Sequence, residues 1–446
     1  MLTPQLAFSG RSLPSASVDD RILTNLSGAF SLTGICEALL GDVSIKSSAL
    51  RPLQLYTTPC SAEGTFSLTI NTDGVTAPYF AVGDPLIQIK QGSHSPVMTR
   101  IMYISSYPLV KIYNAADLQN MTVGNYAASK AYVLMNDIDL SAVNYTPVGS
   151  GAMNFWRGLF FGEGHTISHL WINSGGQDYK GLFGSAKDGF IQDLHLENAT
   201  VVGYLYVGAL VGRAVGVTMS RVSVTGSVSG FGVAGMIAGY SMDSDIKYSW
   251  ASGVATSLGS EVIGGLIGHS EGGDIVNSWS DVNVISSANV VGGLIGSMDE
   301  GSTDAVLENS FSMGSITGLE GAGGLVGSIW EYNLNSNTPI LKNSFTLANI
   351  VVSNSNPTGY ASGSAIGHAG SLLVSPYVAD PGIQISGLYH LSGATCTYCN
   401  PAAVAHSSAA NLSTILNWSK ATWDYTWTWK THSSGARPDL LVNPKN

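Results

Sequence analysis

The feature that most constrains this chain is a short phrase, Gly-Leu-apolar-Gly, that returns at a nearly fixed interval. Its three strictest copies, Gly-Gly-Leu-Ile/Val-Gly, end at Gly268, Gly296 and Gly327. Looser copies extend the series in both directions, and the final glycines are spaced by 28, 27, 29, 28, 31 and 40 residues. A fixed period of this length predicts a repeat architecture with one structural unit per repeat. The longer intervals near the end are expected to be insertions in turns.

Apolar and polar residues alternate inside each repeat, as at Val222, Val224 and Val228. Alternation with a period of two indicates strands. Two or three short strands cannot bury an apolar face alone, so neighbouring repeats must stack, about 4.8 Å apart, as a solenoid. The sequence therefore predicts an all-β protein built around a parallel β-solenoid, with glycines at the corners and aliphatic residues inside.

A second phrase, Asn-Ser-Trp/Phe-Ser, keeps pace with the first. It begins at Asn277 and Asn309, and Asn343 occupies the same place one repeat later. Amide side chains that recur once per coil can hydrogen-bond along a stack. We expect these asparagines to form an amide ladder in a turn.

The repeats and the segment before them resemble a known family. The segment at 132–140, Tyr-Val-Leu-Met-Asn-Asp-Ile-Asp-Leu, is followed by Thr-Pro-Val-Gly at 146–149 and Gly-Leu-Phe-Phe-Gly-Glu-Gly-His-Thr-Ile at 158–167. Together with the repeated phrase, this order is similar to that of GLUG-repeat proteins, which are bacterial secreted and surface proteins. Phe161 and Glu163 depart from the family's pattern. The resemblance implies a right-handed parallel β-helix and an adhesive or scaffolding role, and implies no single reaction.

The chain before the repeats has a different pattern. Residues 1–22 mix Ser, Pro and charged residues, as tails and linkers do, and residues 23–106 alternate apolar and polar residues between turn residues. The second pattern predicts a small antiparallel β-sandwich, and it resembles the Ig-like modules of bacterial surface proteins. We expect residues 107–124 to cap the start of the solenoid, residues 125–411 to form it, and residues 412–446 to cap its end.

Caps are expected because the open edge of a solenoid would otherwise pair with another chain. In the first cap, Asn114 suits the N-cap of a short helix and Asp117 its first turn. In the second, Trp423, Trp427 and Trp429 alternate with polar residues. This alternation predicts a strand that covers the last coil, and a row of tryptophans also suits stacking on sugar rings, so both roles stay open.

The composition narrows the choice of partner. Charged residues make up 11% of the chain, and the formal net charge is −11. This excess of acid argues against nucleic acid or an anionic membrane as a partner. No apolar run reaches the roughly 18–20 residues of a membrane-spanning helix, and residues 1–10 lack the basic start and apolar core of a signal peptide. We expect a secreted or cell-surface protein whose leader was removed or that leaves the cell by another route.

The four cysteines fall in two local pairs, Cys36 with Cys60 and Cys396 with Cys399. An even number in local pairs is typical of disulfides in an oxidising compartment. The second pair is also a Cys-x-x-Cys motif, but a thioredoxin-like site needs a βαβ setting and a zinc site needs further ligands. We predict two disulfides, and a metal, redox or free-thiol role stays open for the second pair.

One polar position follows the last glycine of most repeats, and stacking would place these residues in an exposed row on one face. The row consists of Ser185, Arg213, Tyr240, His269, Ser297, Ser328 and His368. The predicted ligand-binding residues are Tyr240, His269 and His368 from this row, with Trp423, Trp427 and Trp429.

Acidic residues gather in the turns after this row, and successive coils would bring them into one ledge. They are Asp243, Asp245, Glu271, Asp274, Asp299, Glu300 and Asp304. Such a ledge can be a solvated edge, can bind Ca²⁺, which prefers clustered carboxylate oxygens, or can supply the two carboxyls of a glycosidase. The spacing matches neither an EF-hand loop nor an RTX repeat.

The function that these features favour is non-enzymatic adhesion, with a glycan or a surface protein of another cell as the partner. A solenoid offers a long rigid face on which each coil displays one more side chain. The alternatives are a β-helix polysaccharide lyase or hydrolase and a purely structural fibre or spacer subunit. The sequence has no GxSxG, P-loop or HExxH motif. We expect no cofactor other than Ca²⁺, and association into a homo-oligomer stays open.

Overall fold

In the computed structural model, contacts divide the chain into two compact units, residues 1–108 and 109–446. The finer boundaries expected from the sequence stay predictions. The structure describes residues 22–24, 29–36, 38–46, 50–51, 55–71, 79–80, 86–91, 97–100, 102–104, 109–121, 130–259, 262–287, 290–319, 321–331, 339–352, 366–371, 384–391, 396–397, 408–410, 429–431 and 438–440.

The first unit contains two four-stranded sheets and one strand pair among its described residues. Most neighbouring strands are antiparallel, and Val43, Ile45 and Phe66 are buried. Two sheets with buried apolar residues fit the predicted β-sandwich, whereas the narrower Ig-like assignment stays a prediction. The elements are β1 (Ile22–Thr24), β2 (Ala29–Ile35), a 3-10 helix (Ala38–Leu40), β3 (Val43–Lys46), β4 (Leu50–Arg51), β5 (Tyr56–Thr58), β6 (Thr65–Asn71), β7 (Tyr79–Phe80), β8 (Leu86–Gln91), β9 (Val97–Arg100) and β10 (Met102–Ile104).

Cys36 and Cys60 form a disulfide in this unit, as predicted. Their Cα atoms lie 5.9 Å apart, and the sequence separation is 24 residues. The second predicted pair is not tested, because Cys399 lies outside the described residues and Cys396 is described only as backbone in β43 (Cys396–Thr397).

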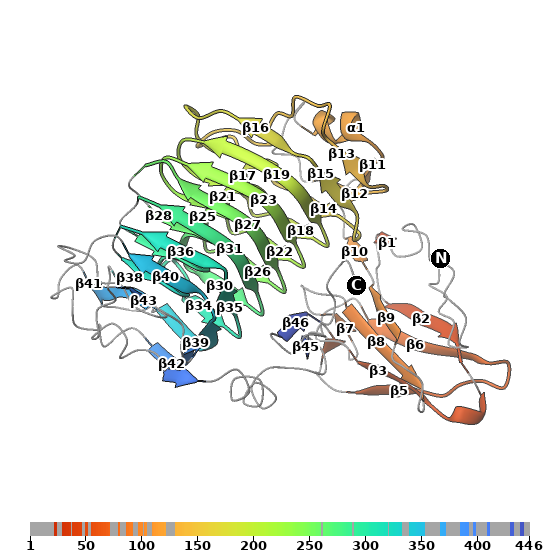
Figure 1. Ribbon diagram of the computed structural model, residues 1–446. Helices are drawn as coiled ribbons and strands as arrows, with labels where there is room; N and C mark the ends of the chain where they lie inside the picture. Colours follow the sequence, from red (N-terminus) through yellow and green to blue (C-terminus); the bar gives the residue numbers. More distant parts are fainter. Residues whose placement is uncertain are drawn as a thin grey trace. The chain divides into compact units, whose positions relative to one another are not determined.

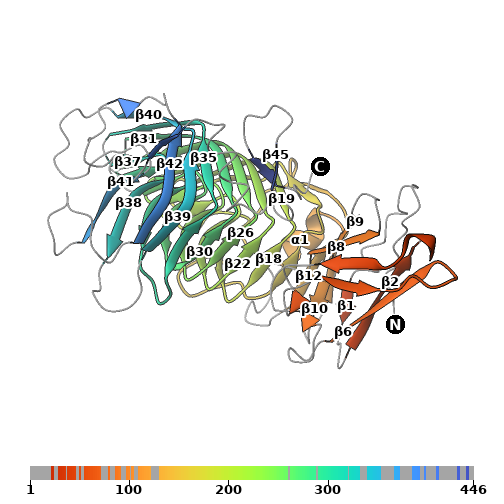
Figure 2. The same cartoon turned by 90° about the horizontal axis from the view of Figure 1, so that it is seen from below.

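The second unit is a parallel β-solenoid of about seven turns (Figure 1). Each complete coil adds strands to three parallel sheets, and the chain then returns to the first sheet one coil further along. The strands pair in register with the strands of the coils before and after them. Both views show β22, β26 and β30 side by side (Figures 1 and 2). The predicted fold class is therefore confirmed.

Two of the three sheets are short-stranded and contain one strand per coil. The described part of the first has seven strands: β17 (Phe183–Lys187), β21 (Val211–Val215), β25 (Ala238–Met242), β29 (Ile267–Glu271), β33 (Ile295–Asp299), β38 (Val326–Glu331) and β41 (Ile366–Ser371). The described part of the second has five: β20 (Val207–Gly208), β24 (Ala234–Gly235), β28 (Val262–Gly264), β32 (Val290–Gly292) and β37 (Ala322–Gly323).

The third sheet runs the length of the solenoid and has 22 strands among the described residues. They are β11 (Leu109–Ile112), β12 (Ala131–Leu134), β13 (Ile138–Asp139), β14 (Leu159–Phe161), β15 (Thr166–Ser168), β16 (Trp171–Asn173), β18 (Phe190–Gln192), β19 (His195–Gly203), β22 (Thr218–Ser220), β23 (Ser223–Gly230), β26 (Asp245–Lys247), β27 (Trp250–Ser257), β30 (Gly273–Val276), β31 (Trp279–Ser286), β34 (Ala305–Glu308), β35 (Phe311–Met313), β36 (Ser315–Gly318), β39 (Pro339–Thr346), β40 (Asn349–Val352), β42 (Gln384–Leu391), β43 and β44 (Ser408–Ala410). A separate antiparallel pair is formed by β45 (Trp429–Thr431) and β46 (Pro438–Leu440).

The repeated glycine phrase forms the corner between two sheets. Its central leucine, or the equivalent aliphatic residue, is buried in each coil, and the buried residues are Leu210, Ile237, Leu266, Leu294 and Leu325. A Cβ atom on Gly293 would lie 2.0 Å from the Gly324 carbonyl oxygen of the next coil. Only glycine allows neighbouring coils to approach this closely.

The second repeated phrase builds a ladder from its serines. Each backbone N–H at this position donates to the serine hydroxyl of the next coil, from Ser249 to Ser278, Ser278 to Ser310 and Ser310 to Ser344, each at 3.2 Å. We call these four residues the serine ladder. The adjacent asparagines have φ between 50° and 53°, so their role is the left-handed turn that asparagine tolerates. Asn309 Oδ1 is buried with no hydrogen-bond partner among the described residues, so the expected continuous amide ladder is wrong.

Next to the serine ladder, aromatic rings stack along the solenoid. The centroids of Trp250 and Trp279 are 5.0 Å apart, those of Trp279 and Phe311 5.8 Å, and those of Phe311 and Phe345 5.0 Å. The interplanar angles are 3°, 7° and 4°. We call these four residues the ring ladder, and their parallel arrangement follows from identical side-chain directions in successive coils.

A short helix, α1 (Ala115–Asn120), packs on the start of the solenoid. Asn114 is its N-cap, and Asn114 Oδ1 accepts the backbone N–H groups of Ala116 and Asp117 at 2.9 and 3.0 Å. The predicted cap residue and first-turn acid are therefore confirmed. Leu118 belongs to the same buried cluster as Leu134, so the helix covers apolar residues of the first coil.

Candidate functional site

The residues that follow the repeat glycines lie in register on the outer face of the seven-stranded sheet. Ser185 pairs with Arg213, Arg213 with Tyr240, Tyr240 with His269, and the register continues through Ser297 and Ser328 to His368. The residues that directly follow Ser297 and Ser328, Met298 and Ile329, point to the opposite side and are buried in the core. The repeat spacing thus places one side chain per coil on this face, as expected.

The expectation that the whole row is exposed is wrong. Ser185, Ser297 and Ser328 are buried, Tyr240 is 8% exposed, and Arg213 and His269 are half-buried, whereas the side chain of His368 is not described. The loop before the repeats explains part of this burial, because the Gly151 carbonyl accepts the Ser185 hydroxyl at 3.0 Å. The small serines further along are held by hydrogen bonds within the row, since Ser328 Oγ donates to Ser297 Oγ at 3.1 Å.

Four rings run in series, from the bends at Tyr179 and Tyr206 onto Tyr240 and His269 of this sheet. The centroids of Tyr179 and Tyr206 are 5.6 Å apart, those of Tyr206 and Tyr240 5.1 Å, and those of Tyr240 and His269 5.3 Å. Tyr179, Tyr206 and His269 are half-buried, so their edges reach solvent. We call these four residues the aromatic band. Arg213 flanks it, with Cζ 5.8 Å from the Tyr240 centroid.

The aromatic band meets two carboxylates at one end. The Tyr240 hydroxyl donates to Glu271, and His269 Nε2 lies 2.6 Å from Asp299 Oδ2. Burial, with the hydrogen bond to Glu271 and its charge, raises the pKa of Tyr240, so the phenol keeps its proton. Burial alone would lower the pKa of His269, but the hydrogen bond with Asp299 and the charges of Asp299 and Glu271 raise it overall.

This arrangement does not match a serine hydrolase. In such a site the imidazole lies between the nucleophile and the carboxylate. Here Asp299 lies between Ser297 and His269, because Ser297 Oγ donates to Asp299 Oδ1 at 3.2 Å. No histidine of the described residues is shown to take the Ser297 proton, so the hydroxyl is not activated for attack.

Glu271 and Asp299 are register partners on neighbouring strands, which makes their carboxyls the candidate pair for glycoside chemistry. A retaining glycosidase needs two carboxyls about 5–5.5 Å apart, one of them a proton donor or acceptor for the sugar. In this structure both carboxylates accept hydrogen bonds from protein side chains: Glu271 from Tyr240, and Asp299 from Ser297. The geometry favours a fixed polar network over free acid and base groups.

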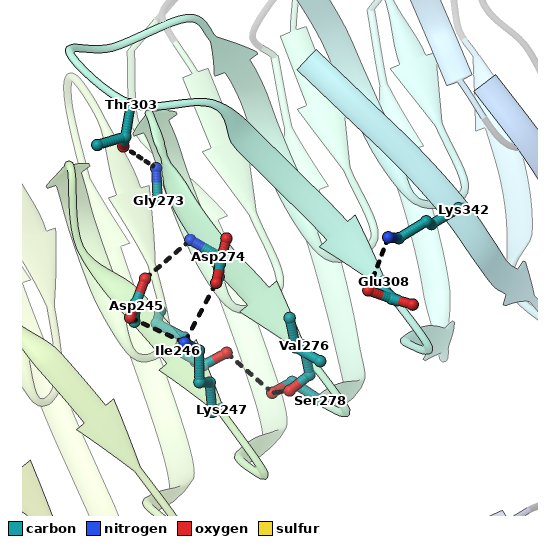
Figure 3. Close-up of polar contacts among 10 residues, drawn as sticks. All are labelled: Asp245, Ile246, Lys247, Gly273, Asp274, Val276, Ser278, Thr303, Glu308 and Lys342. Atoms are coloured by element: carbon teal, nitrogen blue, oxygen red, sulfur yellow. Dashed lines mark hydrogen bonds and ion pairs between the residues drawn. The ribbon is translucent and has the colours of Figure 1, made fainter. Parts of the chain in front are cut away.

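The other predicted acidic residues form separate groups instead of one ledge. Lys247 Nζ lies 2.9 Å from Asp245 and 3.2 Å from Asp274, on the 22-stranded sheet (Figure 3). Burial lowers the pKa of Lys247, but the hydrogen bonds and charges of these two aspartates raise it overall. The same figure shows Lys342 beside Glu308, at 3.1 Å.

Asp243 binds a loop from two coils further along. Its Oδ1 accepts the backbone N–H and the hydroxyl of Thr303, both at 3.0 Å, and its Oδ2 accepts the Ser302 hydroxyl. Thr303 Oγ1 also accepts the N–H of Gly273 in the coil between them, at 3.1 Å. We call this group the Asp243 clasp.

No group of three or more His, Cys, Asp or Glu residues in the described ranges could hold a metal ion. The predicted Ca²⁺ site at Asp243, Asp245, Glu271, Asp274, Asp299, Glu300 and Asp304 is therefore not assembled. The physical reason is that separate lysine, tyrosine, histidine, serine, threonine and backbone donors occupy the carboxylates of Asp243, Asp245, Glu271, Asp274 and Asp299.

Some predicted ligand-binding residues cannot be placed. Trp423 and Trp427 lie outside the described residues, and the side chains of His368 and Trp429 are not described. Sequence reasoning missed Tyr179 and Tyr206, which lie outside the repeated phrase. Both have φ of 57°, and they are 27 residues apart, about one repeat, so this separation was the available signal.

Comparison with known proteins does not identify a family or an activity for this chain. No family model matches this chain. Halomucin from Haloquadratum walsbyi is 30% identical over 219 residues, which is 42% of this chain and 2% of halomucin. The chain thus spans a very small part of that relative.

Two solved structures share part of the arrangement. One, solved as a candidate immunoglobulin A1 protease from Bacteroides ovatus, has 17% identity and a TM-score of 0.49, covering 74% of this chain and 91% of that chain. The other, an IgA1 protease, has 14% identity and a TM-score of 0.39, covering 81% of this chain and 29% of that chain. At these values neither likeness bears on what this chain does. No helix in the described ranges has the length and apolar character to span a bilayer.

Proposed function

We propose that this chain is an extracellular recognition protein that binds glycans through the aromatic band, without catalysis. The observation that carries the proposal is the series of four rings, each 5.1–5.6 Å from the next, two on strands of the seven-stranded sheet and two in the bends before β17 and β20. Tyrosine and histidine combine an apolar ring with a polar edge, which suits a sugar whose faces are apolar and whose rim is hydroxylated. Sites of this kind place a few polar groups among aromatic side chains.

The solenoid supports the same proposal by its rigidity. Each coil adds one ring to the aromatic band, and the strands that carry Tyr240 and His269 pair in register. A pre-organised row loses little side-chain freedom when an extended ligand binds along it. The Cys36–Cys60 disulfide supports the extracellular setting, because such bridges persist in oxidising compartments. Kinship with GLUG-repeat surface proteins, suggested by the repeated phrase, and with Ig-like modules, suggested by the alternation at residues 23–106, is part of this proposal.

A matched pair of variants tests the aromatic band. Tyr206→Ala removes the ring between Tyr179 and Tyr240, whereas Tyr204→Ala removes an exposed ring, two residues earlier, that stacks on Phe231 instead. On a broad glycan array, we expect wild type and Tyr204→Ala to bind the same glycans and Tyr206→Ala to lose roughly 10-fold in affinity, as removal of one contact ring does at binding sites. No binding by the wild type, or equal loss in both variants, would refute the proposal.

The hydrolase alternative rests on the pairing of Glu271 with Asp299. It predicts shortened oligosaccharides after incubation, and loss of turnover in Glu271→Gln and in Asp299→Asn. A recognition protein should leave the ligand intact, and these variants should change only its affinity. A structural spacer would bind nothing on the array.

A further inference from the structure

Arg213 is held in place by aromatic rings. Its Cζ lies 5.4 Å from the centroid of Phe155 and 5.8 Å from that of Tyr240. Stacking against two rings fixes the plane of a guanidinium group and keeps its fork of N–H donors in one orientation. Phe155 belongs to the loop before the repeats, so two separate segments of the chain converge on this one side chain.

The donors of Arg213 have no acceptor within the described residues. Arg213 makes no ion pair or side-chain hydrogen bond there, and its Nε is buried without a partner. Buried donors nearly always have an acceptor, so an unsatisfied one needs an explanation. Acid is in excess in this chain, with 30 Asp and Glu against 19 Lys and Arg, so a shortage of carboxylates does not explain it.

Four other Lys and Arg residues that the structure describes in the solenoid form ion pairs, whereas Lys130 forms none there and Lys180 donates to Gln177. The pairs are Arg157 with Asp188, Arg221 with Asp193, Lys247 with Asp245 and Asp274, and Lys342 with Glu308. Like Arg213, Lys187 has no carboxylate partner among the described residues. It lies on the same outer face, with Nζ 6.0 Å from the Phe155 centroid.

Two acids near these cations in the sequence or beside Tyr240 have donors of their own. Asp188, next to Lys187 in sequence, pairs with Arg157, and Glu271 accepts the Tyr240 hydroxyl. Lys187 and Arg213 therefore have no carboxylate partner among the described residues, and Arg213 lies against Tyr240, the ring whose hydroxyl Glu271 accepts.

We infer that Phe155, Lys187 and Arg213 form a subsite for the anionic group of an acidic glycan, a carboxylate or a sulfate. This inference rests on the proposed function, because it names the ligand class of the aromatic band. The guanidinium fork of Arg213 matches two oxygens of such a group, Lys187 adds a point charge, and the rings take the neighbouring sugar faces. A neutral glycan would leave both cations without a partner.

The test uses the full-length protein and matched ligands. Titration calorimetry would compare a hexuronic acid oligosaccharide with its carboxyl-reduced, neutral counterpart, and dextran sulfate with dextran. The variants are Arg213→Gln and Lys187→Gln, with Lys342→Gln as a control that removes one positive charge from the other sheet. Lys187→Gln keeps the test valid if the ring-packed Arg213 variant does not fold.

We expect wild type to prefer one acidic ligand over its neutral counterpart, and the preferred pair identifies carboxylate or sulfate. Arg213→Gln should weaken binding of the acidic ligand by about 10- to 100-fold, and Lys187→Gln by about 2- to 5-fold, whereas Lys342→Gln and the neutral ligands should be unaffected. Equal binding of acidic and neutral ligands, or equal loss for both in Arg213→Gln, overturns the subsite and leaves glycan recognition standing. Binding of none of the four ligands, together with an empty glycan array, overturns both.

Discussion

Replacement of one serine in the serine ladder provides a direct measure of what holds successive coils together. Ser278 is fully buried. Its hydroxyl accepts the backbone N–H of Ser249 at 3.2 Å and donates to the Val276 carbonyl at 3.0 Å. Ser278→Ala removes the hydroxyl and leaves every other side chain in place.

The magnitude follows from which groups lose their partners. The Val276 carbonyl still accepts the Tyr248 N–H at 3.1 Å, so it remains satisfied. The Ser249 N–H has no other acceptor within the described residues and becomes a buried, unsatisfied donor. Such a group costs about 1–3 kcal/mol, and we expect Ser278→Ala to lower the free energy of unfolding by this amount.

Urea titration followed by tryptophan fluorescence measures this change, because Trp250 and Trp279 lie directly after Ser249 and Ser278 in sequence. Ser229→Ala is the matched control: Ser229 lies on β23 and makes no side-chain hydrogen bond with a described residue. It should change the free energy of unfolding by less than about 0.5 kcal/mol. If Ser278→Ala destabilised no more than Ser229→Ala, the inference that the hydroxyl satisfies a buried N–H would be wrong.

Three further predictions concern other contacts. Phe311→Leu should lower the free energy of unfolding by about 1–3 kcal/mol, since it removes two ring pairs, and Phe311→Ala by about 3–5 kcal/mol; no measurable loss in Phe311→Leu in urea titrations would argue against stacking. His269 has a raised pKa in the folded state, so its contribution to stability is complete below its ordinary pKa of 6.5 and is lost as the pH rises through the folded-state pKa. The difference in free energy of unfolding between wild type and His269→Gln should therefore shrink from pH 6 to pH 9, and a constant difference would contradict this. Removal of both Cys36 and Cys60 should destabilise the first unit by about 3 kcal/mol, and thermal unfolding of the reduced wild type should match that of the double variant.

The coil architecture could be predicted from the sequence because it depends on short-range rules that repeat. Glycine at positions such as Gly293 reflects a close approach that recurs in each coil, and the alternation around Val222 reflects the pleat of a strand. The disulfide between Cys36 and Cys60 and the N-cap at Asn114 are likewise local. These features are set within a few tens of residues.

The candidate site depends on contacts that no repeat encodes. Phe155 contacts Arg213 from a loop outside the repeats, and the Gly151 carbonyl in the same loop accepts the Ser185 hydroxyl. The spacing of the repeats therefore could not predict that Arg213 lacks a carboxylate partner or that Ser185 is buried. The acidic turns show the same limit. Asp245 and Asp274 both pair with Lys247, which lies on the same strand as Asp245. This pairing depends on the side-chain directions in two neighbouring coils.

The Asp243 clasp has a consequence for how the solenoid opens. In linear arrays each unit contacts only its immediate neighbours, so fraying proceeds one unit at a time. Asp243 instead reaches Thr303, and Thr303 also holds Gly273 of the coil between. The corner at Gly273 can open only if the hydrogen bonds that Thr303 makes to it and to Asp243 break together. Hydrogen exchange of the backbone amides in these three coils should therefore report a single cooperative opening.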